Sequence, residues 1–344
     1  MQTDKIAVIE LSTKAVKWLI PQVDNEVIQN NPFRFNFFSR ESRKTETGNG
    51  LNKMNVLDER YFVSRVLPYI KQAYNDIINA GADVVYCVAT AVYRSARNIN
   101  SILQIIRDEI NLEVRVLTEE EEAEYTLWAY YYSTNNKETL LQKPYTLLVD
   151  QGGGSTEITL FHQQKLVFRQ SFDMGTTILK NDFFSQHFLT ASERLRYIDS
   201  KYKKDIFEKL QGMKISETLL SNNNDIYCIC VGTAVTAAFG DGSKHNVDVH
   251  EKMLNAYIIQ NIIEARTDEF AKFPVEELQT KIEIGSSKTH TLEKRFASRL
   301  GLPIICDILH FFNVQEFRIS GTGLWYGVFY TAFYNSFPLH NQND

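Results

Sequence analysis

Two segments of the chain repeat one pattern, and this repeat constrains the fold more than any other feature of the sequence. Residues 6–13 and 147–155 are each an apolar run that ends in a carboxylate, Glu10 or Asp150, followed by small and polar residues. A second apolar segment follows each run, so both stretches predict a β-hairpin. The two carboxylates lie 140 positions apart. We interpret the pair as a duplicated domain with two facing hairpins and a cleft between them.

The rest of the chain alternates between strand-like and helix-like segments. Apolar runs rich in β-branched residues predict strands at residues 83–89, 114–117, 164–169, 225–231 and 317–320. Helical spacing of apolar residues predicts helices at 58–80, 99–110, 178–220, 246–312 and after residue 321. This alternation is typical of an α/β layer structure.

The turn of the second hairpin has the composition of a phosphate-binding loop. It consists of Gly152, Gly153, Gly154, Ser155 and Thr156. Glycine accepts positive φ and brings backbone N–H groups close to a ligand. An ordinary two-residue turn needs at most one or two glycines, so the third favours a phosphate site over a hairpin that binds nothing. Asp150 at the end of the first strand can hold a divalent metal.

Two further features indicate a functional site. Gly232 and Thr233 begin a small-residue turn at the mouth of a predicted helix, where backbone N–H groups attract anions. A run of four glutamates follows Thr118, the expected N-cap of another helix. Carboxylates in a first turn complement the helix dipole, but four exceed that need. Glu121, Glu122 and Glu124 cannot all point the same way, so at least one should face a cleft.

The composition excludes several classes of protein. The formal net charge of -5 argues against broad nucleic-acid binding, which usually requires a basic domain. No apolar run is long enough to span a bilayer, and the N-terminus lacks the pattern of a secretory signal. Four cysteines lie in apolar contexts without zinc-site spacing, so buried thiols are expected at Cys87, Cys228, Cys230 and Cys306. We expect a cytoplasmic protein that binds neither nucleic acid nor membrane.

Taken together, the motifs resemble those of the exopolyphosphatase and guanosine pentaphosphate phosphatase family, within the actin, Hsp70 and sugar-kinase superfamily. The resemblance covers residues 5–330. It rests on motifs in the same order as in the family: Ala89-Thr90-x-x-x-Arg94-x-Ala96-x-Asn98, Glu121-Glu122-Ala123, the glycine hairpin through Glu157, Met174-Gly175, Gly232-Thr233, and Gly323-Leu324 with Gly327.

The resemblance implies two ribonuclease-H-like, actin-like ATPase domains, each a mixed five-stranded sheet flanked by helices, with the active cleft between them. It implies a first domain at residues 1–125, completed by a C-terminal helix at about 325–344, and a second at 126–324. Family members often pair, so we also expect a homodimer.

The resemblance also implies roles for single residues. Glu122 matches the catalytic glutamate that orients or deprotonates the attacking water, and Arg94 matches an arginine whose fork clamps a phosphoryl group. Asp150 and Glu157 match acids linked to Mg²⁺, and Glu10 is a third candidate ligand at the equivalent end of the first hairpin. A hard cation on one or two carboxylates neutralises phosphate charge as a terminal phosphoanhydride is hydrolysed.

The first hairpin departs from the family pattern. Where the family has Asp-Leu-Gly-Ser-Asn-Ser, this chain has Glu10-Leu11-Ser12-Thr13-Lys14-Ala15. Ser12, Thr13 and Lys14 are candidate phosphate-binding residues, but a side chain at position 12 restricts the approach of the backbone to phosphate. Two interpretations stay open: a phosphohydrolase acting on polyphosphate or a guanosine polyphosphate, or a catalytically weak or inactive member that senses a phosphorylated ligand and acts through a partner. A small-molecule kinase is a third, for which no adenosine-site signal is found.

Overall fold

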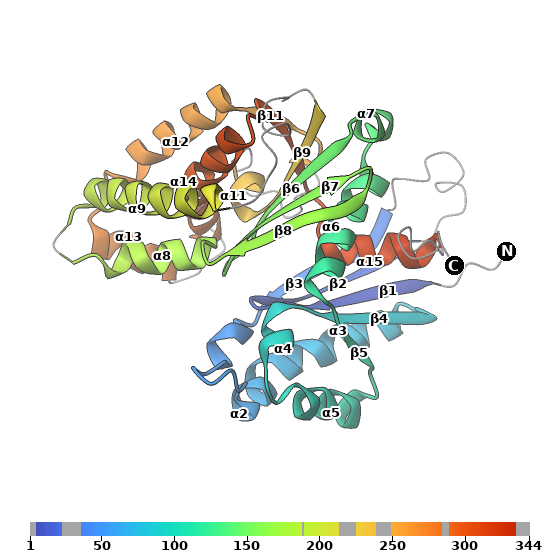
Figure 1. The fold of residues 1–344 in the computed structure, drawn as a ribbon. Coiled ribbons are helices and arrows are strands. Elements are labelled where there is room, and N and C mark those ends of the chain that lie inside the picture. The colour runs from blue at the N-terminus through green and yellow to red at the C-terminus, as the bar shows by residue number, and fades with distance from the viewer. Residues whose placement is uncertain are drawn as a thin grey trace. The chain divides into compact units, whose positions relative to one another are not determined.

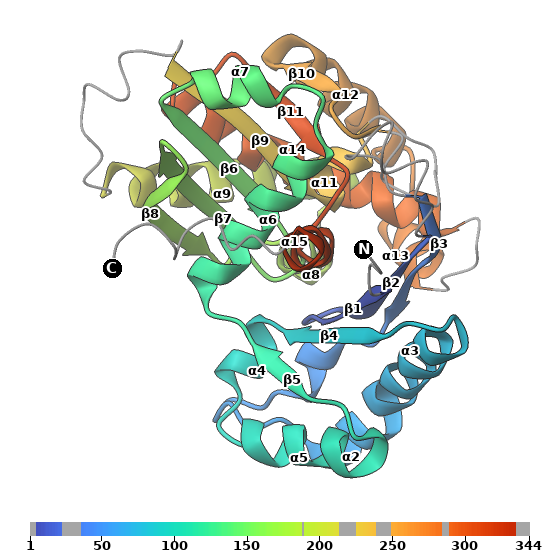
Figure 2. The same cartoon turned by 90° about the vertical axis from the view of Figure 1, so that its right-hand side faces the viewer.

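The computed structural model describes residues 5–22, 36–187, 189–212, 225–238, 249–283 and 289–334. The chain forms two compact units, Met1–Asn135 with Thr322–Asp344, and Asn136–Gly321 (Figures 1 and 2). Each unit contains one mixed β-sheet with helices on it, so the predicted α/β class with two actin-like domains is confirmed.

The first unit is built on a five-stranded sheet of order β3-β2-β1-β4-β5. The strands are β1 (Ile6–Leu11), β2 (Ala15–Gln22), β3 (Asn36–Lys44), β4 (Val84–Ala89) and β5 (Val114–Val116). β1, β2 and β3 pair antiparallel, whereas β1, β4 and β5 pair parallel. β3 is an additional strand that the sequence analysis did not predict.

Alternate residues of β1 enter two different cores of the first unit. Ala7, Ile9 and Leu11 pack with α3 (Leu67–Asn79) and α5 (Ile99–Ile110). Val8 on the opposite face packs with α6 (Glu119–Ser133) and α15 (Leu324–Phe333). This alternation is the period of two expected of a strand that is covered on both faces. The described part of the unit also contains shorter helical segments: a 3-10 turn Thr47–Gly50, α2 (Glu59–Tyr61), a π-helical stretch Phe62–Val66 and α4 (Ala91–Ser95).

The C-terminal helix packs closely on α6. A Cβ atom at Gly327 of α15 would lie 1.8 Å from the carbonyl oxygen of Tyr125, so only glycine permits this approach. Because α6 continues to Ser133 along this contact, the first segment of the unit ends at Asn135. The domain boundary expected after residue 125 therefore falls inside a helix.

The second unit is built on a six-stranded sheet of order β10-β11-β9-β6-β7-β8. Its strands are β6 (Tyr145–Gln151), β7 (Thr156–His162), β8 (Lys165–Phe172), β9 (Ile226–Gly232), β10 (Met253–Asn255) and β11 (Glu316–Ser320). Without β10, the order β8-β7-β6-β9-β11 repeats that of the first sheet, with the same parallel and antiparallel pairs. The predicted duplication is therefore visible in the topology. The sheet has six strands instead of the five expected, because the three-residue strand β10 pairs with β11 at its edge.

Helices bury one face of the second sheet in a large apolar core. The core includes residues of all six strands and of helices α8 (Thr176–Ser185), α9 (Ala191–Gln211), α12 (Ala256–Phe270), α13 (Val275–Glu283) and α14 (Thr289–Phe311). The described part of the unit also contains two short helices, α7 (Lys137–Gln142) and α11 (Thr233–Thr236). Cys228 and Cys230 on β9 are buried free thiols in this core, as predicted. Cys87 is likewise buried in the first unit, and Cys306 is half-buried.

In the described part of the chain, no helix combines the length and the apolar character needed to cross a bilayer.

Candidate active site

The glycine turn of the second hairpin is held from one side by the start of α8. Three backbone hydrogen bonds connect them: Gly175 N to Gly154 O (3.3 Å), Thr176 N to Gly152 O (3.0 Å) and Thr177 N to Gly153 O (2.8 Å). The Thr176 hydroxyl also donates to the Gly152 carbonyl. The three glycine carbonyls are therefore fixed toward α8, and the first N–H groups of α8 are used up by them.

Because the glycine carbonyls point toward α8, the three backbone N–H groups that follow them in the chain point away from α8. In a trans peptide unit, the N–H group points away from the carbonyl of the preceding residue. The N–H groups of Gly153, Gly154 and Ser155 therefore point away from α8. Consecutive backbone N–H groups that converge on one side form an anion-binding concavity. The turn closes on itself through a hydrogen bond from Gly152 N to Ser155 O of 3.0 Å.

The glycines of this turn do not have a left-handed backbone, and a side chain would meet little at two of them. Neither Gly152 nor Gly154 has a positive φ, contrary to the expectation from the sequence. A Cβ at Gly154 would meet no atom within 4 Å, whereas a Cβ at Gly175 would lie 2.3 Å from the carbonyl carbon of Gly153. The position of Gly154 therefore has open space for a side chain.

A Gly154→Ala substitution should separate binding from folding. The fold accepts the added methyl group, and losing glycine should leave stability unchanged or raise it by about 0.4–1 kcal/mol. Binding of inorganic phosphate or pyrophosphate, measured by calorimetry, should weaken because the methyl group occupies space beside the amides.

Gly175→Ala is the matched control. Its methyl group cannot fit against the Gly153 backbone, so both stability in urea and anion binding should fall. If Gly154→Ala retains full anion affinity, the turn is not the binding site.

The Thr156 side chain links the two ends of the glycine turn to the segment before α8 through hydrogen bonds. Its side chain is fully buried, and its hydroxyl donates to the Met174 carbonyl (2.9 Å) and accepts from the Gln151 amide (3.3 Å). Both roles of that hydroxyl are filled by the protein, so the side chain supports the turn, and the contact of Thr156 with phosphate stays a prediction.

Gly232 and Thr233 lie at the same end of the second sheet as the glycine turn. Gly232 pairs with Gln151 in the register of β9 and β6. Its φ is +108°, and a Cβ would lie 2.1 Å from the Gln151 carbonyl oxygen, so only glycine fits. Its carbonyl accepts a hydrogen bond from the Thr236 hydroxyl at 3.0 Å. Gly232 thus lets β9 run close beside β6 at the end of the strands that carries the site.

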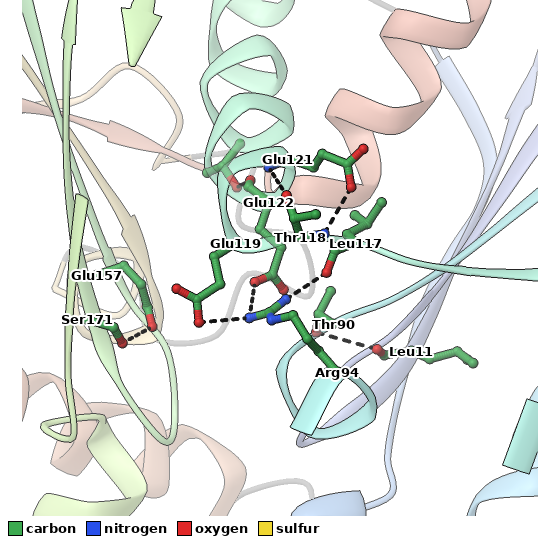
Figure 3. A network of polar contacts seen from close by, with 11 residues as sticks. Leu11, Thr90, Arg94, Leu117, Thr118, Glu119, Glu121, Glu122, Glu157 and Ser171 are labelled. Atoms are coloured by element: carbon green, nitrogen blue, oxygen red, sulfur yellow. Dashed lines mark hydrogen bonds and ion pairs between the residues drawn. The ribbon is translucent and has the colours of Figure 1, made fainter. Parts of the chain in front are cut away.

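Two carboxylates face each other next to the glycine turn. Asp150 and Glu157 are direct partners in the antiparallel register of β6 and β7. Like charges placed directly opposite each other destabilise a strand pair. Glu157 accepts a hydrogen bond from the Ser171 hydroxyl of β8 at 2.9 Å, which orients its carboxylate (Figure 3). A cation held by Asp150 and Glu157 would relieve their repulsion.

The first hairpin is closed by its own serine. The Ser12 backbone N–H and hydroxyl both donate to the Ala15 carbonyl (3.0 and 2.9 Å), and the hydroxyl accepts from Ala15 N (3.2 Å). Ala15 corresponds to Ser155 of the second hairpin, where Gly152 has no side chain to occupy the amide. The serine in place of the family's glycine therefore removes one backbone donor from this turn.

Thr13 and Lys14 form the tip of the first hairpin. The segment after β3 holds their carbonyls: Gly48 N donates to Thr13 O at 3.0 Å, and Thr45 N and Glu46 N donate to Lys14 O at 2.8 and 2.9 Å. The segment after β8 holds the second turn in the equivalent way. The two hairpins thus have the same support, although they differ in the residues of the turn.

Glu10 lies at the end of β1, in the position that Asp150 has on β6. Glu10 is 4% exposed, and its Oε1 is 2.7 Å from Nζ of Lys17 on β2. This ion pair does not suit the predicted role of Glu10 as a metal ligand, because the carboxylate is already neutralised and is closed to solvent.

Arg94 and Glu122, predicted as the catalytic pair, are in contact in the first unit (Figure 3). Nη2 of Arg94 is 3.0 Å from Oε2 of Glu122 and 3.4 Å from Oε1 of Glu119, and Nη1 donates to the Leu117 carbonyl at 2.8 Å. Both side chains are partly accessible, with 25% of Arg94 and 19% of Glu122 exposed. An incoming phosphoryl group could thus reach the guanidinium by competing with these carboxylates.

The capping box of α6 keeps the Glu121 carboxylate away from Arg94. Thr118 accepts a hydrogen bond from Glu121 N, and the Glu121 carboxylate accepts one from Thr118 N. Glu121 also pairs with Arg115. The Glu121 side chain is therefore committed to the helix start, and Glu122 is turned toward Arg94. The predicted N-cap at Thr118 is confirmed.

Two residues without a predicted role anchor the chain on either side of α4, which carries Arg94. Thr90, just before α4, donates from its backbone N–H to the Leu11 carbonyl of the first hairpin at 3.0 Å. Asn98 binds both backbone groups of Leu57 at 2.9 Å. Thr90 and Asn98 both belong to the sequence motif around Arg94. Their presence in this motif was the feature of the sequence from which a supporting role could have been predicted.

The chain matches the Ppx/GppA phosphatase family over residues 26–335. It is 25% identical over 212 residues to the bifunctional 3-dehydroquinate synthase/phosphatase of Fusobacterium nucleatum; the match spans 60% of this chain but only 31% of that protein. The Ppx/GppA family member of Aquifex aeolicus has a similar structure, with a TM-score of 0.69 at 22% identity over 96% of this chain and 98% of that one.

An exopolyphosphatase of Cytophaga hutchinsonii has the same fold, with a TM-score of 0.70 at 17% identity over 96% of this chain and 98% of that one. These structural matches concern the fold, whereas the match over residues 26–335 includes the glycine turn, Arg94 and Glu122. The chain therefore belongs to the Ppx/GppA phosphatase family.

Proposed function

We propose that the protein hydrolyses the terminal phosphoanhydride of inorganic polyphosphate or of guanosine pentaphosphate, with the help of Mg²⁺. The observation that carries the proposal is the second hairpin, where outward-facing amides lie beside the opposed carboxylates Asp150 and Glu157. Amides suit phosphate oxygens, and two carboxylates together with phosphate oxygens suit Mg²⁺. Membership of the Ppx/GppA phosphatase family supports a hydrolase.

The residues divide the work of the reaction. Asp150 and Glu157 would hold the ion, which supplies positive charge to the phosphate oxygens as the terminal P–O bond breaks. Arg94 would bind the transferred phosphoryl group through its fork. Glu122 would accept a proton from the attacking water, whose oxygen forms the new bond to phosphorus while the shortened chain leaves with the electron pair.

The metal assignment rests on two carboxylates and not on a protein cage. Among the described residues, no group of three or more His, Cys, Asp or Glu is placed to hold a metal. Mg²⁺ usually keeps several waters and binds through one or two carboxylates plus substrate phosphates, so the pair on the second hairpin is a sufficient donor set.

One observation favours a second function, a sensor that binds the same ligand without turnover. Ser12 occupies the Ala15 amide, so the first hairpin offers one donor fewer than the second. Against this, the Arg94 and Glu122 pair is retained. A homodimer in the cytoplasm is part of either proposal.

Phosphate release distinguishes the two functions. We expect the purified protein with Mg²⁺ to release phosphate from long-chain polyphosphate, from guanosine pentaphosphate, or from both, and to stop when the metal is chelated. Tight binding of both ligands without any release would instead establish the sensor.

A further inference from the structure

The duplicated hairpins differ in the residue that faces the carboxylate. In the second hairpin, Asp150 lies opposite Glu157. In the first, Glu10 occupies the equivalent place on β1 and lies opposite Lys17. Both partners are seven residues after the carboxylate and one pair below the turn. At this equivalent position, the second unit thus pairs two acidic residues, whereas the first unit pairs an acidic residue with a basic one.

Lys17 already supplies the positive charge that Glu10 needs. Its Nζ is 2.7 Å from Oε1 of Glu10, with 5% of the Glu10 side chain and 31% of the Lys17 side chain exposed. A buried carboxylate requires a counter-ion or hydrogen bonds to remain charged. The Lys17 ammonium therefore provides the positive charge next to Glu10 that a metal ion would otherwise have to provide.

The second oxygen of Glu10 does not offer a place for a hydrated ion. Oε2 is inaccessible to solvent and has no hydrogen-bond partner among the described residues. Val8, on the same face of β1, packs with α15, which closes this side of the strand. Mg²⁺ gives up its waters reluctantly, and an ion at Oε2 would lie within a few ångströms of the Lys17 ammonium and be repelled by it.

We propose that Lys17 is a built-in counter-ion that takes the place of a metal at Glu10. Divalent-cation binding then depends on Asp150 and Glu157 of the second hairpin and not on the first hairpin. This inference rests on the proposed metal-assisted hydrolysis, but it concerns where the ion is held and not whether turnover occurs.

Mn²⁺ binding to the full-length protein, measured by calorimetry and by the electron paramagnetic resonance of the free ion, tests the assignment without an activity assay. We expect Asp150→Asn to weaken Mn²⁺ binding by at least about tenfold, the scale seen when groups at a metal site are removed. Glu10→Gln, which changes the equivalent carboxylate in the equivalent hairpin, should alter Mn²⁺ affinity by less than about twofold.

Three results would overturn the proposal: a loss of affinity in Glu10→Gln as large as in Asp150→Asn, no effect of either substitution, or no Mn²⁺ binding by the wild-type protein. Failure of the proposed function looks different. In that case Mn²⁺ would bind with the expected dependence on Asp150, yet no phosphate would be released from either substrate.

A double-mutant cycle tests the ion pair itself and does not depend on metal. Lys17→Met should lower the midpoint of urea unfolding because it leaves the buried Glu10 carboxylate without a counter-ion. Glu10→Gln combined with Lys17→Met should recover part of this loss, so that the double variant is less destabilised than the sum of the single ones. Strict additivity would show that Lys17 does not compensate Glu10.

Discussion

Replacing Glu122 by Gln should reduce phosphate release by about 10²- to 10⁴-fold, the range that a positioned general base contributes. The amide has nearly the same shape, but it cannot accept the proton of the attacking water. Ligand binding should persist, because Glu122→Gln removes a negative charge from beside Arg94, 3.0 Å away, and leaves the guanidinium more available to phosphate. The measurement is steady-state phosphate release together with calorimetric binding of a non-hydrolysable polyphosphate analogue.

Glu119→Gln is the matched control for this experiment. Glu119 belongs to the same helix start and also contacts Nη2 of Arg94, but at 3.4 Å and with about half of its side chain exposed. If the chemical role belongs to Glu122 alone, Glu119→Gln should change the apparent substrate affinity only slightly and leave kcat in place. Equal losses of binding and turnover in Glu122→Gln, or equal losses of kcat in both variants, would contradict a role in the chemical step.

Local patterns in the sequence predicted the elements that carry the site. The glycine turn, the Thr118 capping box and the strand that leads to Gly232 are each defined by adjacent residues whose backbone requirements are specific. The recurrence of a carboxylate at Glu10 and Asp150 predicted the duplication, which the equivalent strand orders of the two sheets bear out.

The features that the sequence did not reveal depend on pairing between distant segments. β3 was missed because charged residues such as Arg40, Glu41 and Arg43 break the apolar alternation on this edge strand. The sequence also suggested that the turn glycines serve positive φ, because the anchoring of their carbonyls by residues 175–177 is a tertiary contact. The pairing of Glu10 with Lys17 could not be assigned either, since it requires the strand register and not only the spacing.

The buried guanidinium of Arg299 connects three helices of the second unit and should contribute strongly to the stability of that unit. Arg299 of α14 is 2% exposed. Its Nη1 and Nη2 bind the two carboxylate oxygens of Asp199 on α9 at 2.9 and 2.7 Å. Its Nε donates to the Thr267 hydroxyl of α12 at 2.6 Å. The guanidinium thus has all three nitrogens engaged, and the bidentate geometry fixes α9 against α14.

Asp199→Asn should lower the free energy of unfolding by about 3–5 kcal/mol, because it leaves a buried guanidinium without a counter-ion. Arg299→Met should cost less, since the carboxylate that remains is one-third exposed and can be solvated. Urea denaturation of both variants measures the difference. Glu208→Gln is the control on the same helix: Glu208 pairs with Lys204 on the surface at 3.8 Å, and its loss should change stability by less than about 0.5 kcal/mol. If Asp199→Asn is as mild as Glu208→Gln, the buried pair does not hold the helices together.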